Sequence, residues 1–144
     1  MKPFSLLTVL KHRKILEDQA IHRLVQAQEA EHNAQQQLDK NEEILLHLIE
    51  TLAREQINGI EVIKQAQFEQ RILLLEKQRL TLQTILRGKK EETNRAQKHL
   101  ISRSKDRKIM ETLQTKQNEA WQLYLHQKET ATLDEIAVIF HNRK

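Results

Sequence analysis

Apolar residues recur every three or four positions along two long stretches of the chain. The first stretch steps from Val9 to Leu52 through Leu16, Ala20, Leu24, Ala27, Ala34, Leu38, Leu45 and Leu48. The second runs from Phe68 to Tyr124 through Ile72, Leu75, Leu82, Leu86, Ala96, Leu100, Met110 and Leu113. Spacings of about 3.5 to 3.6 residues place one narrow apolar stripe on each of two helices, which is the pattern of a coiled coil.

A single break separates the two stripes. Asn58-Gly59 can supply the left-handed residue that ends a helix and starts a turn. We therefore expect a helix over about 5–56, a turn over 57–60 and a second helix over about 61–141. Pairing around this turn would bring residue i near residue 117 minus i, so that the end of the second helix has no partner. The predicted fold is all-α, a single domain over 1–144 that forms a long two-helix antiparallel coiled-coil hairpin with a longer C-terminal arm.

Two features could interrupt the second helix. Gly88 lies well inside it and is expected to be a soft spot, since glycine costs about 1 kcal/mol relative to alanine in a helix. Thr132-Leu133-Asp134-Glu135 has the spacing of a capping box, which leaves open a break near 130–132 followed by a short terminal helix.

The composition excludes several classes of protein. With 2 Gly, 1 Pro and 3% aromatic residues, the chain lacks the turns and side chains of a β-sheet, and with no Cys it has no disulfides or thiolate ligands. The longest apolar run is 136–140, far short of the roughly 20 residues that span a bilayer. We expect a cytoplasmic protein without membrane insertion.

Residues that could carry catalysis show no recognisable arrangement. The 7 histidines never occur at the i, i+4 spacing of a helical metal site, and no glycine-rich phosphate loop is present. No catalytic, cofactor-binding or metal-binding residues are predicted, so the chain is expected not to be an enzyme.

Charge is unevenly distributed. Residues 1–16 contain four basic residues and no acidic one, and residues 87–108 contain nine basic residues against three acidic ones. In the hairpin these stretches form a basic terminal half, which is either a solvated surface or a site for an acidic protein partner. Nucleic acid is disfavoured because no aromatic residues are interleaved with the charges. Trp121 and Tyr124, three residues apart, are candidate binding anchors, with packing in a terminal bundle or homodimer as the alternative.

Both ends of the chain carry a recognisable pattern. The N-terminal pattern is Phe4-x-Leu6-x-x-Val9-Leu10-x-x-Arg13-x-x-x-Glu17, and the C-terminal one is Leu133-Asp134-Glu135-x-Ala137 followed by Phe140 and Arg143-Lys144. Together with the length and the position of the turn, they resemble the FliJ family of flagellar export proteins over the whole chain.

The resemblance implies a stalk similar to the central shaft of rotary ATP synthases. Such a protein inserts into the hexameric export ATPase ring, promotes its assembly and activity, touches the cytoplasmic domain of the export gate and in some members binds export chaperones. It needs no cofactor and lies peripherally at the inner-membrane export apparatus. The resemblance implies a gate surface of Phe68, Ile72 and Leu75, and a ring surface of Leu6, Leu10, Arg13, Trp121 and Tyr124.

Several alternatives stay open from the sequence. The three gate residues could simply begin the seam of the second helix. Leu75 and Arg79 also depart from the small residue and the histidine that the family tends to have at these two positions. The chain could be the equivalent stalk of a virulence-type secretion system. It could also be a structural or nucleic-acid-associated coiled coil that dimerises through its terminal overhang.

Overall fold

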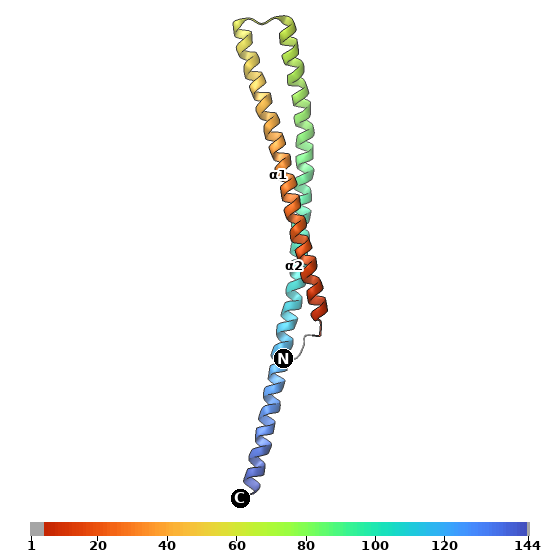
Figure 1. The fold of residues 1–144 in the computed structure, drawn as a ribbon, viewed down its shortest axis with the longest axis vertical. Coiled ribbons are helices and arrows are strands. Elements are labelled where there is room, and N and C mark those ends of the chain that lie inside the picture. The colour runs from red at the N-terminus through yellow and green to blue at the C-terminus, as the bar shows by residue number, and fades with distance from the viewer. Residues whose placement is uncertain (1–4, 144) are drawn as a thin grey trace. The chain divides into compact units, whose positions relative to one another are not determined.

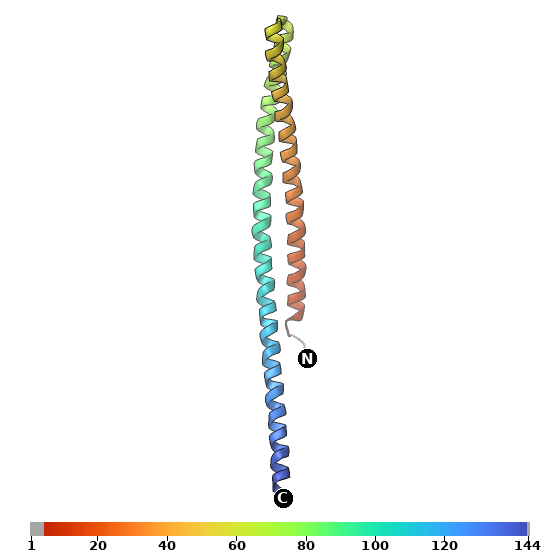
Figure 2. The same cartoon turned by 90° about the vertical axis from the view of Figure 1, so that its left-hand side faces the viewer.

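The computed structural model describes residues 5–143 and contains two long helices. Helix α1 spans Leu7–Asn58 and helix α2 spans Val62–Asn142, and residues 59–61 connect them. The helices pack against each other in opposite directions (Figures 1 and 2), and the described residues include no strand. The predicted all-α antiparallel hairpin with a longer C-terminal arm is confirmed. Phe4 and Lys144, which belong to the two terminal patterns, lie outside the described residues.

Contacts divide the chain into two compact units. Unit 1 consists of residues 1–19 and 100–144, and unit 2 consists of residues 20–99. Each unit therefore contains one segment of α1 packed antiparallel to one segment of α2, and each has its own buried seam.

The turn lies in unit 2 and is centred on Ile60. Gly59 has a φ of 87°, the left-handed conformation expected there, and its N–H donates to the carbonyl of Gln56 at 3.4 Å. Because α1 continues through Asn58 and α2 begins only at Val62, the centre of the turn is later than the sequence suggested.

The later centre shifts the pairing of the two helices. In unit 2, Leu38 packs with Leu82 and Leu86, and in unit 1, Leu10 packs with Met110. The predicted partners of Leu38 and Leu10 were near positions 79 and 107. That pairing was wrong by about one helical turn, because it was centred between Asn58 and Gly59, whereas the turn is centred on Ile60.

The seam of unit 2 is small and partly polar. Most of its buried and half-buried positions alternate at intervals of three and four residues, as in a left-handed coiled coil. On α1 they are Ala20, Leu24, Ala27, Glu31, Ala34, Leu38, Asn41, Leu45, Leu48, Leu52 and Glu55, and on α2 Gln65, Phe68, Ile72, Leu75, Arg79, Leu82, Leu86, Lys89, Thr93 and Ala96.

The seam of unit 1 contains a higher proportion of charged and amide side chains. Its buried and half-buried positions at the same spacing are Leu10, Arg13 and Glu17 on α1, and Leu100, Arg103, Arg107, Met110, Gln114, Gln117 and Trp121 on α2. Val9 and Leu113, which were expected in the stripes, are 38% and 43% exposed. Their neighbours Leu10 and Gln114 occupy the seam instead. In a coiled coil, the spacing of three and four residues determines which positions face the other helix, whether the residue there is apolar or polar.

Helix α2 passes through both of its suspected interruptions. Gly88 is helical, and the helix continues through 130–132, so the break considered there is absent. The Thr132 hydroxyl donates to the carbonyl of Lys128 at 3.0 Å. It bonds back to the preceding turn of its own helix, as threonine commonly does within helices, and does not cap a new one.

Candidate partner-binding surfaces

The last part of α2 is exposed along its whole length. We call residues 122–143 the terminal segment; every one of them is exposed. Within unit 1, α2 continues beyond the first residue of α1, so α1 does not cover this segment (Figure 2). Its large apolar residues are Leu123, Tyr124, Leu125, Leu133, Ile136, Val138, Ile139 and Phe140. A run of exposed apolar side chains on one helix is typical of a surface that a partner covers.

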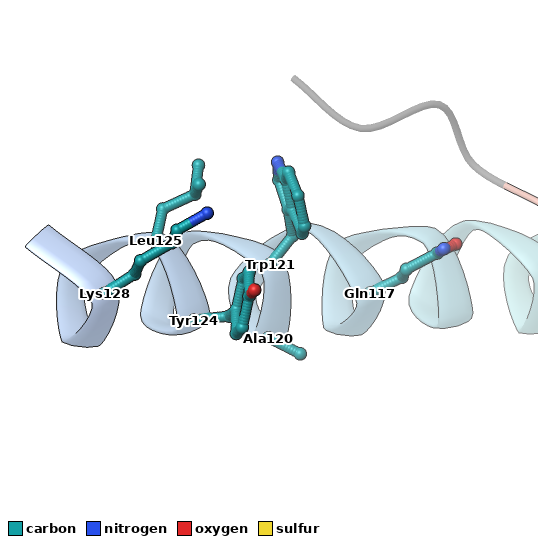
Figure 3. Close-up of a pocket in the computed structure, with 6 residues that line it drawn as sticks. All are labelled: Gln117, Ala120, Trp121, Tyr124, Leu125 and Lys128. Atoms are coloured by element: carbon teal, nitrogen blue, oxygen red, sulfur yellow. The ribbon is translucent and has the colours of Figure 1, made fainter.

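An aromatic pair stands where the seam of unit 1 ends. The rings of Trp121 and Tyr124 are stacked, with centroids 5.4 Å apart and planes inclined by 24° (Figure 3). Trp121 is half-buried, whereas Tyr124 is 51% exposed. Gln117, Ala120, Leu125 and Lys128 complete a shallow surface depression around the two rings. The stacking limits the motion of both rings. A partner that contacts them would therefore lose less conformational entropy in fixing these two side chains.

The N-terminal residues of the predicted ring surface have different environments. Leu6 is 42% exposed, but Leu10 is only 2% exposed because it packs against Met110. Arg13 is half-buried and donates from Nη1 to the carbonyl of Asp106 at 2.8 Å. Leu6 therefore presents its side chain to solvent, whereas Leu10 and Arg13 join the two helices of unit 1.

An ion cluster that the sequence reasoning missed lies next to Arg13. Arg107 bonds to both carboxylate oxygens of Glu17 at 2.8 and 2.9 Å and to Glu111 at 2.7 Å. The hydrogen bond from Arg107 and a second from Ser104 lower the pKa of the Glu17 carboxyl below its ordinary value. Glu17 appears in the N-terminal pattern, but its partner could be found only with the correct pairing of the helices.

Unit 1, which contains this cluster, also carries exposed basic side chains. Lys11 and Lys14 on α1 and Lys105 and Lys108 on α2 are all exposed within unit 1. Exposed charges of one sign attract an oppositely charged partner and speed its association, an effect that salt weakens.

The predicted gate residues lie in unit 2, early in α2. Phe68, Ile72 and Leu75 are all half-buried, at successive positions of the seam. The backbone carbonyl of Leu75 accepts a hydrogen bond from Nδ2 of Asn41 at 3.3 Å. The three side chains thus help to pack α2 against α1 and keep part of their surface in solvent.

Residues 5–143 contain no group of three potential ligands, among His, Cys, Asp and Glu, that could hold a metal ion. Neither described helix is long and apolar enough to cross a membrane.

The family model described as flagellar FliJ protein matches residues 1–144, the whole chain. The chain belongs to the FliJ family. No curated protein and no solved structure matches it. Membership in the FliJ family makes the chain a structural component of flagellar protein export.

The FliJ match also gives the exposed surfaces a context. Among the open alternatives, it favours the flagellar system over a virulence-type one. The exposed surfaces described above in unit 1 are the terminal segment and the partly exposed pair Trp121–Tyr124.

Proposed function

We propose that this chain is the stalk of the flagellar export ATPase. Its unit 1 surfaces bind within the hexameric ATPase ring, promote assembly of the ring and raise its rate of ATP hydrolysis. The chain itself supplies no chemical group to the reaction. The observation that carries this proposal is the exposed terminal segment, whose apolar side chains no part of α1 covers.

The ring contact rests on the aromatic pair and its neighbours. Tryptophan and tyrosine are enriched among the residues that dominate binding energy. Trp121 and Tyr124 are held in one stacked arrangement, and Leu6 is exposed in the same unit. Leu10 and Arg13 act indirectly, because their side chains hold the two helices of unit 1 together. The exposed lysines of unit 1 favour acidic positions on the ring.

Activation follows from unequal binding to the conformations of the ring subunits. One asymmetric stalk in a six-fold ring contacts each subunit differently. A bound partner shifts an equilibrium between two conformations only by its difference in affinity for them. The stalk therefore favours the conformation that hydrolyses ATP in the subunits that it contacts most tightly.

A second contact is proposed for unit 2. Phe68, Ile72 and Leu75 bind the cytoplasmic domain of the export gate through the parts of their side chains that remain in solvent. This contact places the chain at the cytoplasmic face of the inner membrane, at the export apparatus. Export chaperones that have released their cargo are further candidate partners for the same unit.

The ring proposal is tested by titrating the purified chain into the purified export ATPase with Mg-ATP. Substoichiometric amounts should raise hydrolysis. The double variant Trp121→Ala/Tyr124→Ala should bind the ring at least about tenfold more weakly, as expected for central aromatic anchors. Leu46→Ala is the matched control, because Leu46 is a 58% exposed apolar residue in unit 2. Unchanged hydrolysis across the titration would refute the stalk function.

The gate proposal is tested by measuring the affinity of the chain for the isolated cytoplasmic gate domain. Phe68→Ala should weaken binding, whereas Leu74→Ala should not, since Leu74 is 55% exposed and lies outside the seam on the same stretch of α2. Circular dichroism of both variants is needed because Phe68 also packs in the seam. If Phe68→Ala retains both helicity and affinity, the gate surface is elsewhere.

A further inference from the structure

We propose that the terminal segment also binds the terminal segment of a second copy of this chain, in antiparallel orientation, to form a weak homodimer. The apolar face that forms the contact consists of Leu125, Ile136 and Ile139, with Thr132 between them. These residues are exposed and are spaced at multiples of about one helical turn, so that they lie on one side of α2.

The spacing of this face selects one pairing with its own copy. In an antiparallel pair of identical helices, residues whose numbers add up to a constant lie opposite each other. A total of 261 places Leu125 opposite Ile136 of the second copy and Ile139 opposite Gln122 of the second copy. Because the pair has two-fold symmetry, each contact occurs twice. Leu133 and Phe140 flank the same face and widen its apolar area, since both are more than 60% exposed.

Charge distinguishes this pairing from the parallel one. Lys128 and Glu135 flank the apolar face on the side opposite Leu133, seven residues apart. In the antiparallel pairing, Lys128 lies beside Glu135 of the second copy, and the symmetry gives two such pairs. In a parallel pairing in register, opposite flanks of the two helices meet, so Lys128 would lie beside Leu133 of the second copy and Glu135 beside its Phe140, and neither charge would have an opposite charge as its neighbour. Flanking charges of this kind determine orientation and partner choice in coiled coils.

One residue at the centre of the face limits the affinity. Glu129 falls between Leu125 and Thr132, close to the two-fold axis, where the two copies bring a pair of carboxylates near each other. The paired stretch is also short, about 20 residues or about 30 Å of helix. Interfaces smaller than the standard size are weak and transient. We therefore expect a dissociation constant of about 10 to 100 μM.

The dimer does not depend on the proposed stalk function, but the two would be linked. The face that pairs with the second copy belongs to the same terminal segment that is proposed to enter the ATPase ring. A ring and a second copy would therefore compete for it, and unbound chain would cover its exposed apolar residues by dimerising. The stalk proposal can fail while the dimer stands, because the dimer is measured on the purified chain alone.

The experiment is sedimentation of the full chain over a range from about 1 μM to about 1 mM, where we expect a reversible monomer–dimer equilibrium. Lys128→Glu and Glu135→Lys should each weaken the dimer at least about tenfold, and combining them should restore it. Lys116→Glu is the matched control, since Lys116 is exposed on the same helix but would face no residue of the second copy. Glu129→Leu should tighten the dimer at least about tenfold.

The single tryptophan gives a second readout of the same equilibrium. Trp121 would lie level with Phe140 of the second copy, at the edge of the contact, so its fluorescence should shift over the same concentration range as the sedimentation coefficient. A chain that stays monomeric up to about 1 mM would overturn the proposal. A dimer that is insensitive to the two charge reversals would also overturn it, because that dimer would use another surface.

Discussion

Arg107 on α2 joins α1 through Glu17, because its Nε donates to both carboxylate oxygens of Glu17, at 2.8 and 2.9 Å. Its Nη1 donates to Glu111 on its own helix at 2.7 Å. The side chains of Glu17 and Arg107 are only 14% and 21% exposed, whereas that of Glu111 is 40% exposed. In unit 1 a charged pair thus occupies positions that apolar residues fill in most coiled coils.

Replacing Glu17 by Gln should lower the stability of unit 1 and change how stability depends on pH. The hydrogen bond from Arg107 lowers the pKa of Glu17 in the folded chain below its ordinary value of about 4.3. The carboxylate therefore contributes stability above that ordinary value, and the contribution is lost as the pH falls through the lower folded pKa. Wild type should lose more stability than Glu17→Gln between pH 6 and pH 2, as measured by urea unfolding followed by circular dichroism.

Glu111→Gln is the control for this comparison. Glu111 bonds to the same guanidinium but stays on one helix and is more exposed, so its removal should have a smaller effect. Equal pH dependence in wild type and Glu17→Gln would mean that the pair with Arg107 adds no net stability.

The pairing of the helices in unit 1 can be tested with introduced cysteines, because the natural chain has none. Leu10 packs against Met110, so the double variant Leu10→Cys/Met110→Cys should react rapidly with a short thiol cross-linker. The double variant Leu10→Cys/Arg107→Cys should react at least about tenfold more slowly. Its two cysteines would be neighbours only if the turn were centred on Asn58-Gly59, as the sequence predicted. The two rates can be compared by the change in gel mobility after timed quenching.

If Leu10→Cys/Arg107→Cys reacts faster than Leu10→Cys/Met110→Cys, the pairing of the helices in the structure is contradicted. Arg107→Cys also removes the ion pair with Glu17, so the helicity of both double variants must match before their rates are compared.

The periodicity of the sequence predicted both helices to within two residues at each end. It also predicted the left-handed glycine of the turn, because Asn58-Gly59 is the single strong turn signal between the stripes. The exact centre of the turn could not be read from that signal, and an error of about one helical turn in the pairing followed. The polar seam residue Asn41 appeared only as a gap in the first stripe, and Leu16 was placed in that stripe instead of Glu17. The partners of Asn41 and Glu17 could not be found because they depend on the pairing.

Asn41→Leu should stabilise unit 2. Asn41 is 6% exposed, and while its Nδ2 donates to the Leu75 carbonyl, its Oδ1 has no hydrogen-bond partner among the described residues. A buried polar atom without a partner costs about 1–3 kcal/mol, which exceeds the net gain of about 1 kcal/mol from one hydrogen bond. We expect a net increase of about 1 kcal/mol in the free energy of unfolding, measured by urea denaturation.

Gln37→Leu serves as the comparison, because Gln37 is exposed on the same stretch of α1 and should change stability little. A loss of stability in Asn41→Leu would show that the bond to Leu75 outweighs the unpaired oxygen. Asparagine at a seam position commonly fixes the pairing of helices at a cost in stability. The more stable variant is therefore expected to tolerate alternative pairings, which the cross-linking pairs at Leu10 would detect.

The two glycines should respond in opposite ways to the same substitution. Gly88 is helical and an added Cβ would meet no atom within 4 Å, so Gly88→Ala should raise the free energy of unfolding by about 1 kcal/mol. Gly59 also has open space around it, but its φ of 87° is unfavourable for alanine. Gly59→Ala should therefore lower stability by about 1–2 kcal/mol, the cost of the left-handed conformation. Urea unfolding of the two variants measures both effects. Because neither site is crowded, steric clashes do not complicate the comparison. If Gly59→Ala raises the free energy of unfolding, the turn does not need a left-handed residue.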